Sequence, residues 1–104
     1  MAIQTYNFPT HKRGTTFNGV QFELKINGTA RDLTGSKITM VLDGNNEAFS
    51  TVTGEIIFSD AANGKFQFKK QVVNISPKNH SYEMQFVFGD GEEKVYLSGY
   101  WKIV

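Results

Sequence analysis

The stretch that decides the fold is VQFELKING, residues 20–28. Apolar and polar side chains alternate along it, and the apolar set is Val20, Phe22, Leu24 and Ile26. Such alternation is typical of a β-strand with one face buried and the other in water. Asn27 and Gly28 follow at once, and this dipeptide favours a type I′ turn because both residues tolerate a positive φ. The stretch therefore predicts an amphipathic strand that enters a tight hairpin.

The same period-two pattern recurs along the chain, at 37–42, 65–68, 81–88 and 94–103. Turn-forming residues separate these segments, at 43–46, 59–64, 76–79 and 89–93. Residues 48–53 are rich in Thr and Ser, and we expect them to form an edge strand. No window shows the 3.6-residue period of a stable helix, and parallel sheets with long crossover helices do not fit this length. We predict an all-β protein, an immunoglobulin-like antiparallel β-sandwich of seven or eight short strands.

The immunoglobulin-like assignment depends on Tyr82, which heads a predicted strand after the loop at 75–81. That placement suits a tyrosine corner, in which the hydroxyl bonds back to the backbone of the upstream loop. An ordinary core tyrosine at the start of a strand is the alternative. In the last strand, Gly99 indicates a bulge or a close approach of backbone. The residues expected to face inward there are Val95, Leu97, Trp101 and Ile103.

Length and composition bound the domain organisation. With 104 residues the chain is expected to form one domain, 1–104, in which residues 1–19 are either an N-terminal arm or a first edge strand. It has no cysteine, which excludes disulfides and thiolate chemistry. The net charge of +1 and the absence of a signal peptide or a long apolar run predict neither nucleic-acid binding nor a membrane segment.

Catalytic chemistry has little support in the sequence. His11 and His80 both lie in predicted loops, where we expect them to be exposed and idle. The pair Glu92 and Glu93 is expected to be a solvated turn, since adjacent strand residues point to opposite faces. Residues 43–47 offer oxygen ligands but lack the spacing of a calcium loop. We therefore expect no enzyme activity, no cofactor and no metal site.

An interaction surface is the more probable functional feature. Several aromatic side chains fall off the inward parity or in loops, and one basic run lies between two of the phenylalanines. The candidate interface residues are Tyr6, Phe8, His11, Lys12, Arg13, Phe17, Phe49, Tyr96 and Tyr100. Exposed aromatics can anchor a protein interface or stack on a sugar, and ordinary partial burial is the third alternative. The basic run predicts contact with acidic groups on a neighbour rather than with nucleic acid.

The chain resembles the small β-sandwich domains of tailed bacteriophages, in particular the N-terminal domain of baseplate upper proteins. The resemblance rests on FPTHKRGTTFNGVQFEL (8–24), NG (27–28), DLTG (32–35), ITM (38–40) and GYWKI (99–103). In those domains a similar entry leads to an amphipathic strand, a hairpin and a corner, and a G-x-W-x-I strand closes the fold. These motifs are turn and core residues, so the likeness implies fold and kinship and marks no active site.

The resemblance implies a non-enzymatic virion structural protein of the tail, baseplate, neck or capsid. Its expected partners are other copies of itself and other virion proteins, and it would be made in the bacterial cytoplasm. A carbohydrate-binding module that uses exposed aromatics such as Phe49, Tyr96 or Tyr100 to bind a host glycan is the alternative.

Overall fold

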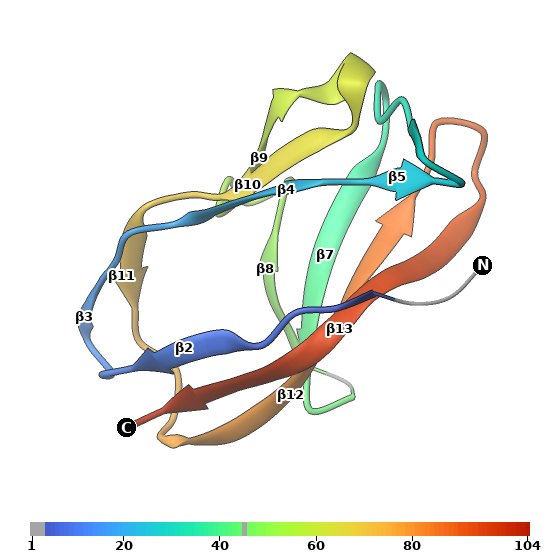
Figure 1. Cartoon of the computed structure of the whole chain (residues 1–104). Coiled ribbons are helices and arrows are strands. Elements are labelled where there is room, and N and C mark those ends of the chain that lie inside the picture. Colours follow the sequence, from blue (N-terminus) through green and yellow to red (C-terminus); the bar gives the residue numbers. More distant parts are fainter. Residues whose placement is uncertain (1–3, 45) are drawn as a thin grey trace.

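The computed structural model describes residues 4–44 and 46–104, and it confirms an all-β fold with several antiparallel sheets (Figure 1). The one helical element in these ranges is η1, a short 3-10 turn at Ala61–Asn63. Two layers of strands enclose a hydrophobic core, as a sandwich requires. The immunoglobulin-like connectivity stays a prediction.

The larger layer is a six-stranded sheet in the order β1-β13-β12-β7-β8, in which β2 also pairs with β13. Its strands are β1 (Gln4–Thr5), β2 (Phe8–His11), β7 (Lys37–Leu42), β8 (Asn46–Ser50), β12 (Lys78–Val87) and β13 (Glu93–Ile103). Both β1 and β2 run parallel to β13, although we predicted a purely antiparallel sandwich. A parallel neighbour is possible here because the first and last parts of the chain pair directly, with no crossover helix between them.

The second layer contains shorter pieces. They are β3 (Thr15–Phe17), β4 (Val20–Glu23), β5 (Lys25–Ile26), β6 (Thr29–Ala30), β9 (Ile56–Asp60), β10 (Lys65–Phe68) and β11 (Gln71–Val73). The predicted strand at 20–26 is divided at Leu24, whose N–H donates to the Gly64 carbonyl at 2.8 Å. The hairpin prediction is confirmed, since β5 pairs with β6 and φ is 52° at Asn27 and 80° at Gly28.

Aromatic side chains fill the space between the layers. Trp101 is fully buried, and the rings of Phe8 and Phe17 lie 4.5 and 5.2 Å from its ring. Burial of a large apolar side chain contributes roughly 1.5–3 kcal/mol, so this cluster is a principal source of stability.

A β-bulge in the β12–β13 pair corrects the inward set predicted for the last strand. Met84 pairs with Leu97 but Gln85 pairs with Val95, which leaves Tyr96 as the extra residue. A bulge shifts the side-chain alternation by one position. Tyr96 is therefore buried and Val95 only half-buried.

Gly99 is a point of close backbone approach, one of its two predicted roles. It has no bulge, because it pairs regularly with Tyr82. A β-carbon on Gly99 would overlap the Tyr6 carbonyl oxygen and lie 2.9 Å from Asn7 Oδ1. Only glycine lets the N-terminal segment lie this close to β13.

The hydrogen-bond partner of the Tyr82 hydroxyl also differs from the one predicted. It donates to the backbone carbonyl of Tyr6, near the start of the chain, rather than to the loop at 75–81. Tyr82 is buried and faces the N-terminal segment, so the upstream loop is out of its reach. Burial raises the pKa of this phenol above its ordinary value, and at neutral pH the hydroxyl keeps the proton that it donates.

Candidate functional site

The N-terminal segment lies along the edge of the chain's own sheet. The Tyr6 N–H donates to the Ser98 carbonyl at 3.0 Å, and Asn7 Oδ1 accepts from the Tyr100 N–H at 3.1 Å. Of the two alternatives for residues 1–19, residues 4–11 thus occupy an edge-strand position. Residues 1–3 lie outside the described part of the chain.

Two of the expected interface anchors belong to the core instead. Phe8 is 5% exposed and Phe17 is 7% exposed. Both rings pack against Trp101 and against each other, at a ring distance of 5.8 Å. The prediction that these two residues anchor an interface was wrong. The N-terminal segment alternates only weakly in sequence, so its packing against β13 could not be predicted from it.

Phe49 and Tyr96 are also buried, which corrects their prediction as surface aromatics. Phe49 pairs with Met40 on β7, and its ring lies 4.9 Å from that of Phe68 inside the core. The strand that carries it is β8, residues 46–50, rather than 48–53. Tyr96 is turned inward by the bulge described above and packs against Phe86.

The remaining candidates lie at or near the surface. Tyr100 is 55% exposed, and Lys12 and Arg13 are exposed. Tyr6 and His11 are half-buried. His11 is the last residue of β2, which corrects its prediction as an exposed loop residue, and its Nε2 lies 2.9 Å from the Thr15 carbonyl oxygen.

One end of the molecule gathers basic side chains that are distant in sequence. The molecule is 37 Å long and 23 Å across, and β3, β11 and the C-terminus lie together at one end (Figure 1). The turn after β2 is fixed there, because Arg13 donates through its N–H to the Val104 carbonyl and through Nε to Asn74 Oδ1, each at 3.0 Å. We call this region the basic end, and its cations are Lys12, Arg13, Lys69, Lys70, Lys78 and Lys102.

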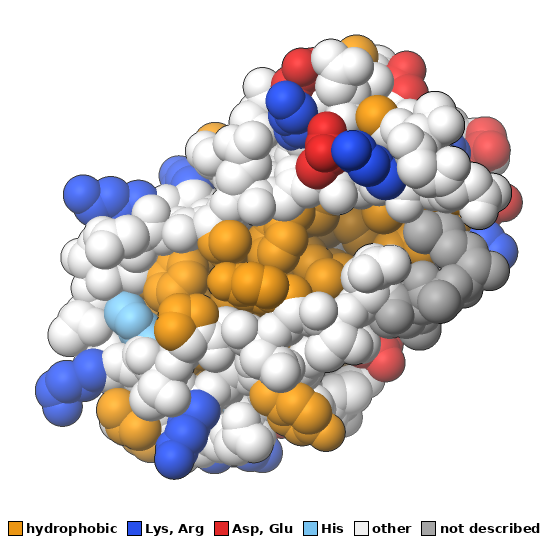
Figure 2. Space-filling model, viewed as in Figure 1, with side chains coloured by type: hydrophobic (Ala, Val, Ile, Leu, Met, Phe, Trp, Pro, Cys, Tyr) orange, Lys and Arg blue, Asp and Glu red, His pale blue; other side chains and the backbone are white. Residues whose placement is uncertain are grey.

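The carboxylates at the basic end are engaged by internal donors. Asp43 accepts from His80 at 2.8 Å and lies 3.5 Å from Lys78 Nζ. Glu55 accepts from the Ser50 N–H at 3.2 Å and from the Thr53 hydroxyl. On the face shown in Figure 2, blue side chains occupy the left end and no red side chain lies among them. The basic end therefore presents mainly positive charge to a partner.

His80 is buried, which corrects its prediction as an exposed loop residue. It lies within β12, is 3% exposed, and shares its parity with Tyr82, Met84 and Phe86. Its Nδ1 lies 2.8 Å from Asp43 Oδ2 and its Nε2 lies 2.7 Å from the Ser76 carbonyl. The hydrogen bond from His80 holds the pKa of Asp43 below its ordinary value. This cluster ties two loops to β12, and the shared parity was the signal that could have found it.

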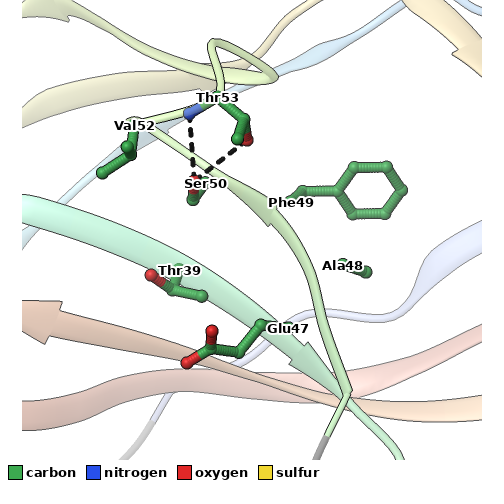
Figure 3. Close-up of a pocket in the computed structure, with 7 residues that line it drawn as sticks. All are labelled: Thr39, Glu47, Ala48, Phe49, Ser50, Val52 and Thr53. Atoms are coloured by element: carbon green, nitrogen blue, oxygen red, sulfur yellow. Dashed lines mark hydrogen bonds between the residues drawn. The ribbon is translucent and has the colours of Figure 1, made fainter.

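Strand β8 lies at one edge of the six-stranded sheet, and several of its features hinder pairing with a neighbouring chain. A hollow of about 360 Å³ lies beside the strand, lined by Thr39, Glu47, Ala48, Phe49, Ser50, Val52 and Thr53 (Figure 3). The strand is short, is bulged at Ala48, and has its Ser50 N–H already bonded to Glu55. Such features prevent strand addition at sheet edges.

Tyr100 lies beside a shallow groove of about 300 Å³ on the outer face of β12 and β13. Its lining includes the hydroxyls of Thr5, Ser81 and Ser98 and the carboxylate of Glu83. Ser81 pairs with Tyr100 and Glu83 pairs with Ser98, so these side chains share one face. An aromatic ring beside hydroxyl and carboxylate groups can bind a polar ligand that has one apolar face.

The described residues were also considered for a metal site and for a membrane-spanning helix. Residues 4–44 and 46–104 contain no cluster of three or more His, Asp or Glu side chains that could hold a metal ion. In the same residues no helix is long and apolar enough to cross a membrane. Comparison of the chain with family models, with curated proteins and with solved structures found no match.

Proposed function

We propose that this chain is a non-enzymatic structural subunit of a bacteriophage particle that acts through protein–protein assembly. The observation that carries the proposal is the basic end, where positive side chains from four segments lie at the same end of the molecule as the exposed Val72 and Val104. A charged rim around apolar groups is typical of protein interfaces. The sequence resemblance to phage sandwich domains supports the same assignment and leaves its position in the particle open.

Particle composition tests this function. The phage that encodes the chain would be purified through two density gradients and analysed by quantitative mass spectrometry. We expect the chain at a fixed copy number relative to the major capsid protein. A chain found only in the lysate supernatant would contradict the proposal.

A carbohydrate-binding module is the second candidate, and the groove beside Tyr100 favours it. The ring would stack on a sugar while Ser81, Ser98 and Glu83 bind its hydroxyls. A glycan array with host polysaccharides tests it, with Tyr100→Ala as the disabling variant. Val52→Ala is the matched control, because Val52 is 72% exposed and does not line this groove. Binding that survives Tyr100→Ala would contradict this candidate.

A further inference from the structure

The near-neutral net charge hides a strong separation of charge along the molecule. Six of the eleven Lys and Arg residues lie at the basic end, together with two of the ten Asp and Glu residues. The rest of the chain therefore holds five basic and eight acidic side chains. Residues 1–3 and 45 carry no ionisable side chain, so this division covers the whole sequence.

The opposite end presents an acidic loop. It consists of residues 89–93, which lead from β12 into the first residue of β13, with the exposed carboxylates Asp90, Glu92 and Glu93. Three basic side chains lie beside it: Lys94 follows it on β13, Lys37 pairs with Val87 as Glu93 does, and the Arg31 guanidinium lies 4.2 Å from the centre of the Phe88 ring. The loop itself carries three carboxylates and no cation. Strand β13 begins at Glu93 and carries Lys102 near its other end, so a single strand separates the two charged regions along the long axis. The loop is well defined, because Asp90 Oδ1 accepts from the Glu92 N–H at 2.9 Å and the Phe88 N–H donates to the Glu92 carbonyl at 2.8 Å.

We propose that the chain assembles head to tail with copies of itself, the basic end of one copy receiving the acidic loop of the next. Opposite charges at opposite ends are complementary between translated copies, whereas two like ends repel. The exposed Val72 and Val104 at the basic end supply apolar contact, which favours a protein occupant over nucleic acid. A head-to-tail contact is heterologous, and it builds a ring or a filament according to the rotation between copies.

The head-to-tail contact rests on the proposed function and identifies a second copy of the chain as the first partner of the subunit. The contact and the structural role can be tested separately. A chain that is monomeric in solution but present in particles overturns head-to-tail assembly and leaves the structural role standing. A chain that associates in solution but is absent from particles does the reverse.

Sedimentation of the purified chain at low and high salt tests the contact. At about 20 mM salt the Debye length is near 20 Å, and at about 500 mM it is near 4 Å, so we expect at least about tenfold weaker association at high salt. The double variants Lys69→Glu/Lys70→Glu and Glu92→Lys/Glu93→Lys should each be monomeric at low salt. Their equimolar mixture should associate again, since the unchanged basic end of one variant can receive the unchanged acidic loop of the other.

The control is Lys25→Glu/Lys65→Glu, which changes the net charge equally but lies on β5 and β10, away from the basic end. It should associate as the original chain does. Three results would overturn the proposal: a monomer under all conditions, association unaffected by salt and by both charge reversals, or a mixture that does not recover. A monomer whose basic end binds a single-stranded DNA oligonucleotide would assign that end to a polyanion instead.

Discussion

At the scale of single residues, Gly99 decides whether the two ends of the chain can meet. We expect Gly99→Ala to lower the free energy of unfolding by roughly 1–3 kcal/mol, since the added methyl group overpacks the contact with Tyr6. Urea denaturation followed by Trp101 fluorescence measures the change. Gly89→Ala is the control, because its β-carbon would lie no closer than 3.4 Å to its neighbour, the Thr34 carbonyl oxygen. Equal losses in both variants would contradict this account.

Asp43 gives a pH dependence whose direction follows from its hydrogen bond with His80. The pKa of Asp43 is lowered from 3.8 in the folded chain, so the ionised carboxylate stabilises the fold above that pH. The stabilisation is lost as the pH falls below 3.8 and through the folded pKa. We expect Asp43→Asn to flatten the fall in unfolding free energy across this acid range, measured by denaturation at several pH values. Glu83→Gln, at an exposed position on the same strand as His80, should leave the slope unchanged.

Residues are also where sequence reasoning failed most often. Alternation at 65–68 and 81–88 predicted strands with one buried face, and Phe66, Phe68, Tyr82 and Phe86 on these strands are buried. It misplaced Tyr96, because a bulge shifts parity and leaves no mark in the sequence. The expectation that a histidine lies in an exposed loop hid the inward position of His80, whose ring nitrogens lie 2.8 Å from Asp43 Oδ2 and 2.7 Å from the Ser76 carbonyl oxygen.

At the scale of elements, the segment formed by β1 and β2 acts as a covering strand for β13. Removal of residues 1–13 takes away Phe8 and the partner of the Tyr82 hydroxyl. Truncating a buried Phe alone typically costs about 3–5 kcal/mol, so we expect the truncated chain to lose at least that stability. Thermal unfolding by circular dichroism measures it, and Lys12→Ala/Arg13→Ala serves as the control. An unchanged Tm would show that the segment contributes nothing to the fold.

The edge strand β8 yields an independent prediction. Glu55→Ala removes the acceptor of the Ser50 N–H and frees that edge for pairing. We expect aggregation that does not respond to salt, measured by light scattering at low and high ionic strength. Glu47→Ala is the control, since Glu47 lies on the same strand but does not bond to Ser50. Aggregation abolished by salt would show that the edge is not responsible.

Whether an element could be predicted depends on whether neighbouring residues or distant contacts determine it. The hairpin at Asn27–Gly28 is fixed by two adjacent residues, so its sequence signal was sufficient. The docking of β2 depends on Trp101 and Tyr82, which lie more than 70 residues away in the chain. No local pattern can report such a contact, and this is why the segment was left open between an arm and a strand.

At the scale of the whole molecule, composition gave the net charge but not the positions of the charged side chains. A net charge of +1 predicted no nucleic-acid binding, yet the fold gathers six of the eleven basic side chains at one end of a molecule 37 Å long. The basic run at Lys12 and Arg13 was a partial signal. Lys69, Lys70 and Lys102 join it only because β10, β11 and β13 end in the same region.

The pairing of β1 and β2 with β13 also has a consequence for synthesis. Residues 4–8 leave the ribosome well before residues 97–101 and must wait for them, since the partners of Gln4 and Phe8 are Leu97 and Trp101. Folding dominated by such distant contacts is slow, in the range of about milliseconds to seconds. A nascent chain therefore keeps an uncovered sheet edge and solvent-exposed aromatic rings until residues 97–101 have been synthesised. Truncated products keep that edge open permanently, which exposes them to proteases and withholds from them the finished shape that a neighbouring subunit could accept.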